Sequence, residues 1–183
     1  EPLSAQLIGF CGPTHGFNYP PVLINFLLKF PGGKQQRVFV CNTRAGLKAG
    51  KLFVPGLSGI ALLLAALILL LKGYRLAGMR SFDMPSNWIS IHPGVKEEVA
   101  LSIMLRCKQK AENFALEMIT GKRNFRALYY LVQDLLVAPV SLGYYLVGRF
   151  IFAKSFYADK HCTNCGLCIK NCPIKAISLV DRR

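Results

Sequence analysis

The feature that most constrains this chain is a run of four cysteines near its C-terminal end. Cys162, Cys165, Cys168 and Cys172 follow the spacing C-x₂-C-x₂-C-x₃-C, and a proline comes directly after the last of them. Thiolates at this spacing on one tight loop can converge on a cube-shaped iron–sulfur cluster. Gly166, between the second and third cysteines, would let the backbone approach the inorganic sulfurs. We therefore expect these four cysteines to be metal ligands.

Two other uses of clustered cysteines fit the pattern less well. Zinc sites usually pair two C-x₂₋₄-C units across a longer spacer, whereas here a third cysteine follows a pair after two residues. Disulfide frameworks are typical of small secreted chains, and we expect no secretory signal in this one. The spacing is the one that bacterial-type ferredoxins use for a [4Fe–4S] cluster. Zinc and structural thiols remain as alternatives.

The charge balance restricts the partners. Lys and Arg number 23 and Asp and Glu number 9, which gives a net charge of +14. A basic surface favours acidic proteins, the anionic inner face of a membrane, or nucleic acid. The basic residues are scattered and form no nucleic-acid motif, so we expect acidic redox proteins or a membrane surface as partners and no nucleic acid. The expected location is the cytoplasm, and the alternative is a peripheral position at the inner face of the membrane.

The first half of the chain alternates between predicted strands and helices, which indicates a parallel sheet with covering helices in an α/β fold. Strands are expected at 5–11, 37–41 and 74–79, and helices at 20–29 and about 57–72. Polar or glycine-containing loops should follow the strands at Gly12–Gly16, Asn42–Gly46 and Ser81–Trp88. Because such loops gather at the carboxyl edge of a parallel sheet, we expect them to share one rim, where ligands bind.

Two apolar stretches raise the question of a membrane span. Residues 52–71 carry no charge, but the part after Pro55-Gly56 is too short for the roughly 30 Å hydrocarbon core. A helix between two neighbouring parallel strands must also fold back onto the sheet. Residues 127–153 are interrupted by polar residues and by Pro139, which should break or kink a helix. We interpret this second stretch as a helical hairpin packed between the sheet and the cysteine segment.

Between these stretches an amphipathic helix should follow His92-Pro93-Gly94 and end at Gly121. Its apolar stripe consists of Val95, Val99, Ile103, Cys107, Phe114 and Met118. Because Cys107 belongs to this stripe, a buried structural thiol is a better interpretation of it than a ligand.

The order of these segments resembles a flavodoxin-like domain fused to a bacterial-type ferredoxin, the architecture of the EFR1-family ferredoxins. Gly12-Pro13-Thr14-His15 is similar to that family's loop after the third flavodoxin strand, and Asn42-Thr43-Arg44-Ala45-Gly46 to the loop after the fourth. Two further segments are similar to the region around the fifth, Leu71-Lys72-Gly73-Tyr74 and Asp83-Met84-Pro85-Ser86-Asn87-Trp88. The resemblance implies a partial flavodoxin-like domain at 1–120, a helical linker at 121–152 and a 4Fe–4S ferredoxin-type domain at 153–183.

The resemblance also implies FMN at the rim, at the switch point of a 2-1-3-4-5 strand order. The residues that would flank the flavin are Pro13, Thr14, His15, Gly16, Asn42, Thr43, Arg44 and Gly46. The chain starts at what resembles the third strand, so the family's phosphate loop is missing and we expect the chain to be a fragment that binds FMN poorly. A second cysteine motif is missing too, and in two-cluster ferredoxins the fourth cysteine ligates the other cluster. Cys172 could therefore serve either cluster.

These observations together predict electron transfer through a [4Fe–4S] cluster, coupled to a flavodoxin-like domain. One alternative is a flavin- and iron–sulfur-dependent oxidoreductase acting on a small molecule, and another is a membrane-associated redox subunit. We expect no catalytic residues, because the sequence offers no nucleophile–base pair or paired carboxylates. His15 and Trp88 are better interpreted as a backbone contact and a packing aromatic than as flavin contacts. His161 should be solvated and could tune the cluster beside it.

Overall fold

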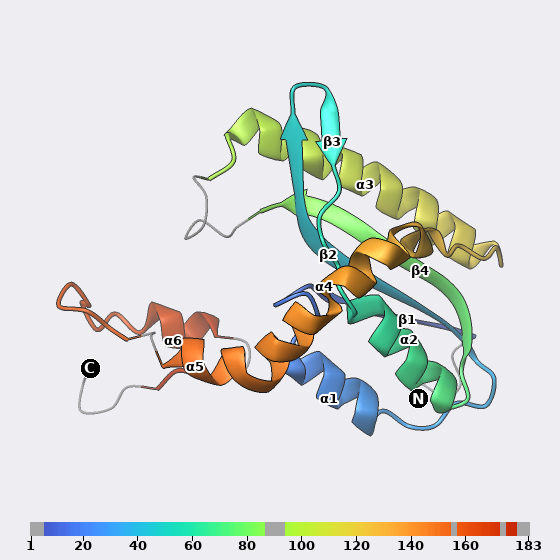
Figure 1. The fold of residues 1–183 in the computed structure, drawn as a ribbon, viewed down its shortest axis with the longest axis horizontal. Helices are drawn as coiled ribbons and strands as arrows, with labels where there is room; N and C mark the ends of the chain where they lie inside the picture. Colours follow the sequence, from blue (N-terminus) through green and yellow to red (C-terminus); the bar gives the residue numbers. More distant parts are fainter. Residues whose placement is uncertain (1–5, 87–93, 155–156, 173–174, 179–183) are drawn as a thin grey trace. The chain divides into compact units, whose positions relative to one another are not determined.

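Two units make up the chain, residues 1–145 and residues 146–183. The computed structural model describes residues 6–86, 94–154, 157–172 and 175–178. The first unit contains β1 (Leu7–Pro13), α1 (Pro21–Lys29), β2 (Arg37–Ala49), β3 (Leu52–Val54), α2 (Ala61–Leu71), β4 (Arg75–Pro85), α3 (Glu97–Ile119), the 3₁₀ helix η2 (Arg126–Tyr130) and α4 (Leu131–Gly143) (Figure 1). The π-helical turn η3 (Tyr144–Gly148) leads to α5 (Arg149–Ala153) and α6 (Leu167–Asn171).

The centre of the first unit is a parallel arrangement of three strands, as the alternation of elements predicted. β2 lies between β1 and β4 and is parallel to both. Val40 of β2 pairs with Phe10 of β1 on one side and with Met79 of β4 on the other. β3 was not predicted, and it pairs antiparallel with the end of β2, so the sheet is mixed.

The strands run further than predicted, and two of the expected loops are wrong in consequence. Asn42–Gly46 belongs to β2, and β4 continues through Ser81 to Pro85. The two segments pair residue by residue up to Gly46 and Pro85, so their backbone groups are satisfied within the sheet. Asn87 and Trp88, at the end of the third expected loop, lie outside the described residues.

Alternate residues of β2 face two separate cores. Val38 and Val40 pack in a cluster with the buried side of α1 and α2. Phe39 and Cys41 belong to a second cluster with Phe114 of α3. This period of two is what a strand covered on both faces requires. The prediction of covering helices is therefore confirmed for the described part of the unit.

The helix α2 packs onto the sheet, as the argument from parallel strands requires. Six of its eleven residues are buried, and the chain turns at Gly73, whose φ of 85° suits a glycine after a helix. Residues 52–71 therefore form a strand, a loop and a short helix instead of one apolar rod. The outer side of α2 remains apolar, with Leu71 79% exposed.

The stripe predicted for α3 also packs as expected. Ile103, Phe114 and Met118 are buried, and Cys107 is half-buried against the second core. A side chain at Gly78 of β4 would meet the sulfur of Met118 at 2.8 Å, so this glycine lets the helix lie close to the strand. The helix ends before Gly121, whose φ is 82°.

The prediction of a helical hairpin at 127–153 is wrong. Helical residues run without a break from Arg126 to Ala153, and Pro139 lies inside α4. Pro139 lacks the N–H that would reach the carbonyl of residue 135. Both residues are exposed, so water can satisfy that carbonyl. This stretch, Arg126–Phe152, is long and apolar enough to cross a membrane by length and composition, and its apolar 18-residue window has a mean hydropathy of 1.6 and is 6% buried.

Candidate functional site

The four cysteines lie on one short segment of the second unit. Cys162 and Cys165 are in the loop before α6, Cys168 is in the first turn of this helix, and Cys172 directly follows it. Gly166 starts the helix with a φ of 69°, in the left-handed region that favours glycine. The position that the sequence singled out for close backbone approach is therefore a sharp turn between two cysteines.

Backbone amides are directed at two of the sulfurs. The N–H of Ala176 donates to Sγ of Cys172 at 3.3 Å. The pKa of Cys165 is lowered, first because the N–H of Leu167 donates to its sulfur and then because the hydroxyl of Thr163 does the same. Such donors stabilise the thiolate, which is the form of cysteine that binds metals.

The four thiols do not form a closed donor set in this structure. Within the described ranges, no three His, Cys, Asp or Glu side chains converge closely enough to hold a metal ion. Cys162, Cys165 and Cys168 are exposed, and Cys172 is half-buried. The segment supplies the donors, and their convergence on a cluster remains a prediction.

His161 makes its contacts with Asp159, two residues before it. Its backbone N–H donates to Oδ1 at 2.9 Å, and its Nδ1 lies 3.0 Å from Oδ2. These hydrogen bonds lower the pKa of Asp159. The His161 side chain is 77% exposed, which agrees with its interpretation as a solvated neighbour of the cysteines.

In the first unit, the structure brings the two sets of predicted rim residues together. The N–H of Thr14 donates to the carbonyl of Thr43 at 2.8 Å, and Nδ2 of Asn42 donates to Oγ1 of Thr14 at 2.6 Å. Pro13 is the last residue of β1 and pairs with Thr43. The expectation that both segments share one rim is therefore confirmed, although Asn42 and Thr43 lie in a strand.

Arg44 of this rim is buried and already paired. Its Nε donates to Oδ1 of Asp83 at 2.8 Å, its Nη1 lies 3.3 Å from the hydroxyl of Ser58, and its guanidinium lies over the ring of Tyr130. Asp83 also accepts from the N–H of Gly56 at 3.0 Å. The Arg44 charge is thus neutralised within the protein.

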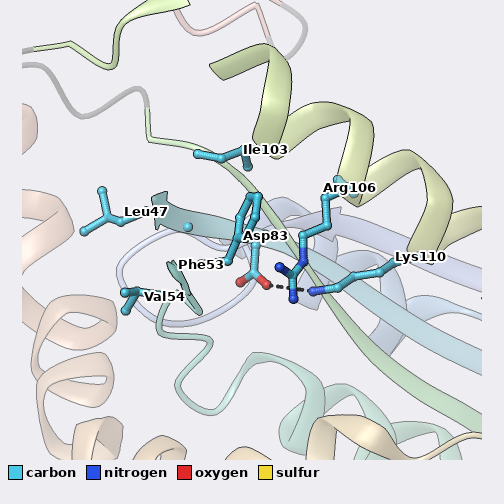
Figure 2. Close-up of a pocket in the computed structure, with 9 residues that line it drawn as sticks. Leu47, Phe53, Val54, Asp83, Ile103, Arg106 and Lys110 are labelled. Atoms are coloured by element: carbon cyan, nitrogen blue, oxygen red, sulfur yellow. Dashed lines mark ion pairs between the residues drawn. The ribbon is translucent and has the colours of Figure 1, made fainter. Parts of the chain in front are cut away.

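Gly46 lines a small hollow beside Asp83 (Figure 2). Lys110 points toward this carboxylate, with Nζ 3.5 Å from Oδ2, and the guanidinium of Arg106 lies over the ring of Phe53. The hollow encloses about 10 Å³, which is room for about one water molecule. A second hollow, lined by Arg44, Arg80, Arg126 and Tyr130 among others, encloses about 40 Å³.

Side chains of the long helical stretch also contact this region of the first unit. The hydroxyl of Tyr144 lies 3.1 Å from Nε2 of His15, and a side chain on Gly16 would meet the Tyr144 ring. Nε2 of Gln133 donates to the carbonyl of Gly56 at 3.2 Å. His15 therefore has a side-chain partner at the rim. Tyr144 thus lies against two of the predicted rim residues, His15 and Gly16.

Two groups of residues at the rim were missed by the sequence analysis. Cys11 and Cys41 oppose each other on β1 and β2, with their sulfurs 2.8 Å apart. Each stands at the end of a predicted strand, but their pairing depends on the register of β1 and β2, which the sequence alone leaves open. Asp134 is buried near Arg44. Nothing in its local sequence distinguishes it from an exposed helix residue.

Comparison with known proteins identifies the cysteine segment. Residues 159–178 match the family model of the 4Fe-4S binding domain. Neither the curated proteins nor the solved structures yield a match to this chain. The second unit therefore contains a 4Fe–4S binding domain, in a chain whose first unit is a mixed α/β fold. The cofactor of this domain is a [4Fe–4S] cluster, and the match spans all four cysteines.

Proposed function

We propose that this chain transfers electrons through a [4Fe–4S] cluster whose ligands are Cys162, Cys165, Cys168 and Cys172. The observation that carries the proposal is the ferredoxin-type cysteine spacing inside the family match. The bound cluster supplies one-electron chemistry. The chain supplies soft thiolates, amide donors to the sulfurs of Cys165 and Cys172, and an exposed position that a redox partner can reach.

The test is anaerobic reconstitution with iron and sulfide. The wild-type chain should develop broad visible absorption that bleaches on reduction with dithionite. Cys165→Ala should lose nearly all of that absorption, because one thiolate of the cube is removed. Cys107→Ala, which removes a half-buried thiol of α3, is the matched control and should keep it. A wild-type protein that stays colourless would refute the proposal.

We further propose that the first unit is a flavodoxin-like domain and that the chain is part of an EFR1-type ferredoxin. The support is the parallel β1–β2–β4 order and the adjacency of Thr14 and Thr43. Because Arg44 is neutralised by Asp83 and Tyr144 lies on Gly16, FMN at this rim would need these side chains to move.

The chain alone should therefore leave the fluorescence of FMN unchanged at micromolar concentrations. Riboflavin, which lacks the phosphate, is the matched ligand control. Saturable quenching by FMN would show that the rim accepts a flavin as it stands, and this prediction would then be wrong.

The partners that we propose are an acidic redox protein and the anionic inner face of a membrane, which places the protein in the cytoplasm. The net charge of +14 supports both. The exposed apolar stretch Arg126–Phe152 supports the membrane surface in particular, because its apolar 18-residue window is only 6% buried. Binding to anionic lipid vesicles is the test of this part of the proposal.

A further inference from the structure

Cys11 and Cys41 are held as a pair by the sheet. They are direct partners in the register of β1 and β2, and their Sγ atoms lie 2.8 Å apart. Neighbouring strands are about 4.8 Å apart, within the span of about 4.4–6.8 Å between Cα atoms that a disulfide accepts. A bond between the two sulfurs would therefore need little movement of the backbone.

The two thiols have different surroundings. Cys11 is exposed, whereas Cys41 is 7% exposed and packs with Ala77 and Phe82. The hydroxyl of Tyr19 donates to the carbonyl of Cys41 at 2.8 Å, which fixes the backbone at the buried partner. Cys11 is therefore the residue of the pair that is open to solvent.

The hydrogen bond between the two thiols also shifts their pKa values in opposite directions. A hydrogen bond from the Cys41 thiol lowers the pKa of Cys11, although partial burial opposes this effect. The same hydrogen bond, then burial, then the charge on Cys11 raise the pKa of Cys41. Of the two thiols, Cys11 therefore loses its proton more readily, and it is the accessible member. Cys107, whose pKa is raised by burial, has no such activation.

We propose that Cys11 and Cys41 form a dithiol site that reduces a small-molecule disulfide. The Cys11 thiolate attacks one sulfur of the substrate, forms a mixed disulfide, and releases the other half as a thiolate that takes a proton from water. Cys41 then gives up its proton to water and attacks Sγ of Cys11. The Cys11–Cys41 bond forms and the second half leaves as a thiolate, which takes a proton from water, so two electrons pass from the dithiol to the substrate.

The experiment uses the full chain with its cluster, under argon, and one equivalent of 2-hydroxyethyl disulfide. After quenching in acid and alkylation, trypsin should release Val38–Arg44 cross-linked to the peptide that contains Cys11. Two small thiols should appear per chain. Cys41→Ser should release one and keep the other half of the reagent on Cys11, and Cys11→Ser should release almost none.

Two results would overturn the site. One is a wild-type chain whose Cys11 carries the reagent without any cross-link, and the other is modification of Cys107 as fast as Cys11. The inference is independent of the cluster, because Cys11 and Cys41 belong to the first unit and the four cluster cysteines to the second. A colourless wild-type chain that forms the cross-link would refute the electron-transfer proposal alone.

Discussion

At the scale of single residues, the rim of the first unit contains charged side chains that are almost completely buried. Arg44 is 3% exposed and Asp134 is 6% exposed, and both are close to Ser58. Arg44 has its closest partner in Asp83, at 2.8 Å. Oδ1 of Asp134 has no hydrogen-bond partner within the described structure. A buried carboxylate that is only partly satisfied should disfavour its own ionised form.

This imbalance predicts a pH dependence of stability. Burial raises the pKa of Asp134 above its ordinary value of 3.8, although Arg44 and the N–H groups of Gly59 and Ser58 oppose the shift. The folded chain then holds the proton more tightly than the unfolded chain, so the free energy of unfolding falls as the pH rises above that ordinary value. Asp134→Asn cannot ionise and should be more stable than wild type at neutral pH.

Urea unfolding at about pH 3.5 and about pH 7.5 measures the effect. The advantage of Asp134→Asn over wild type should be present at the higher pH and shrink at the lower one. Glu112→Gln, which changes a 61% exposed carboxylate on α3, is the control and should show little change at either pH. A larger advantage in acid would mean that the contact with Arg44 outweighs burial.

At the scale of elements, the sequence was sufficient to predict a helix or a binding segment where the pattern involves only neighbouring residues. The helices expected at 20–29 and about 57–72 and the apolar stripe of the helix after Gly94 each follow from neighbouring residues, and the structure contains them as α1, α2 and α3. The cysteine spacing is local too, which is why this segment was identified without a structure.

The errors arise where distant residues decide the outcome. Asn42 and Gly46 are poor strand formers, so the run from Asn42 to Gly46 predicted a loop. They remain in β2 because β4 pairs with them and Asp83, far along the chain, neutralises Arg44. The contact between Cys11 and Cys41 likewise depends on a register that the sequence alone leaves open.

The prediction for the helical stretch 127–153 failed for a related reason. Pro139 predicted a break, yet α4 continues through it. The penalty for a proline inside a helix depends on whether the freed carbonyl can reach water, and this depends on which side of the helix is covered. The sequence pattern does not show which side of the helix is covered, because most residues of the stretch are apolar.

At the scale of the whole molecule, a net charge of +14 accompanies an unusually large exposed apolar surface. Val132 and Leu136 lie one turn apart on α4 and are 74% and 76% exposed. Leu67 and Leu71 of α2 are also exposed. Apolar patches of this kind on an otherwise basic protein fit an anionic membrane surface, where apolar burial and charge attraction add.

Vesicle flotation tests this interpretation. The protein should float with vesicles that contain anionic lipid and much less with purely zwitterionic ones, since each Lys or Arg near the surface is worth about 1 kcal/mol. Leu136→Glu should weaken binding by about tenfold or more. Leu116→Glu makes the same change at a 61% exposed leucine of α3 and should have a small effect. Peripheral protein should be released by alkaline carbonate, whereas retention would indicate a span. Equal losses in the two variants would show that net charge alone drives binding, and α4 would then have no special part in it.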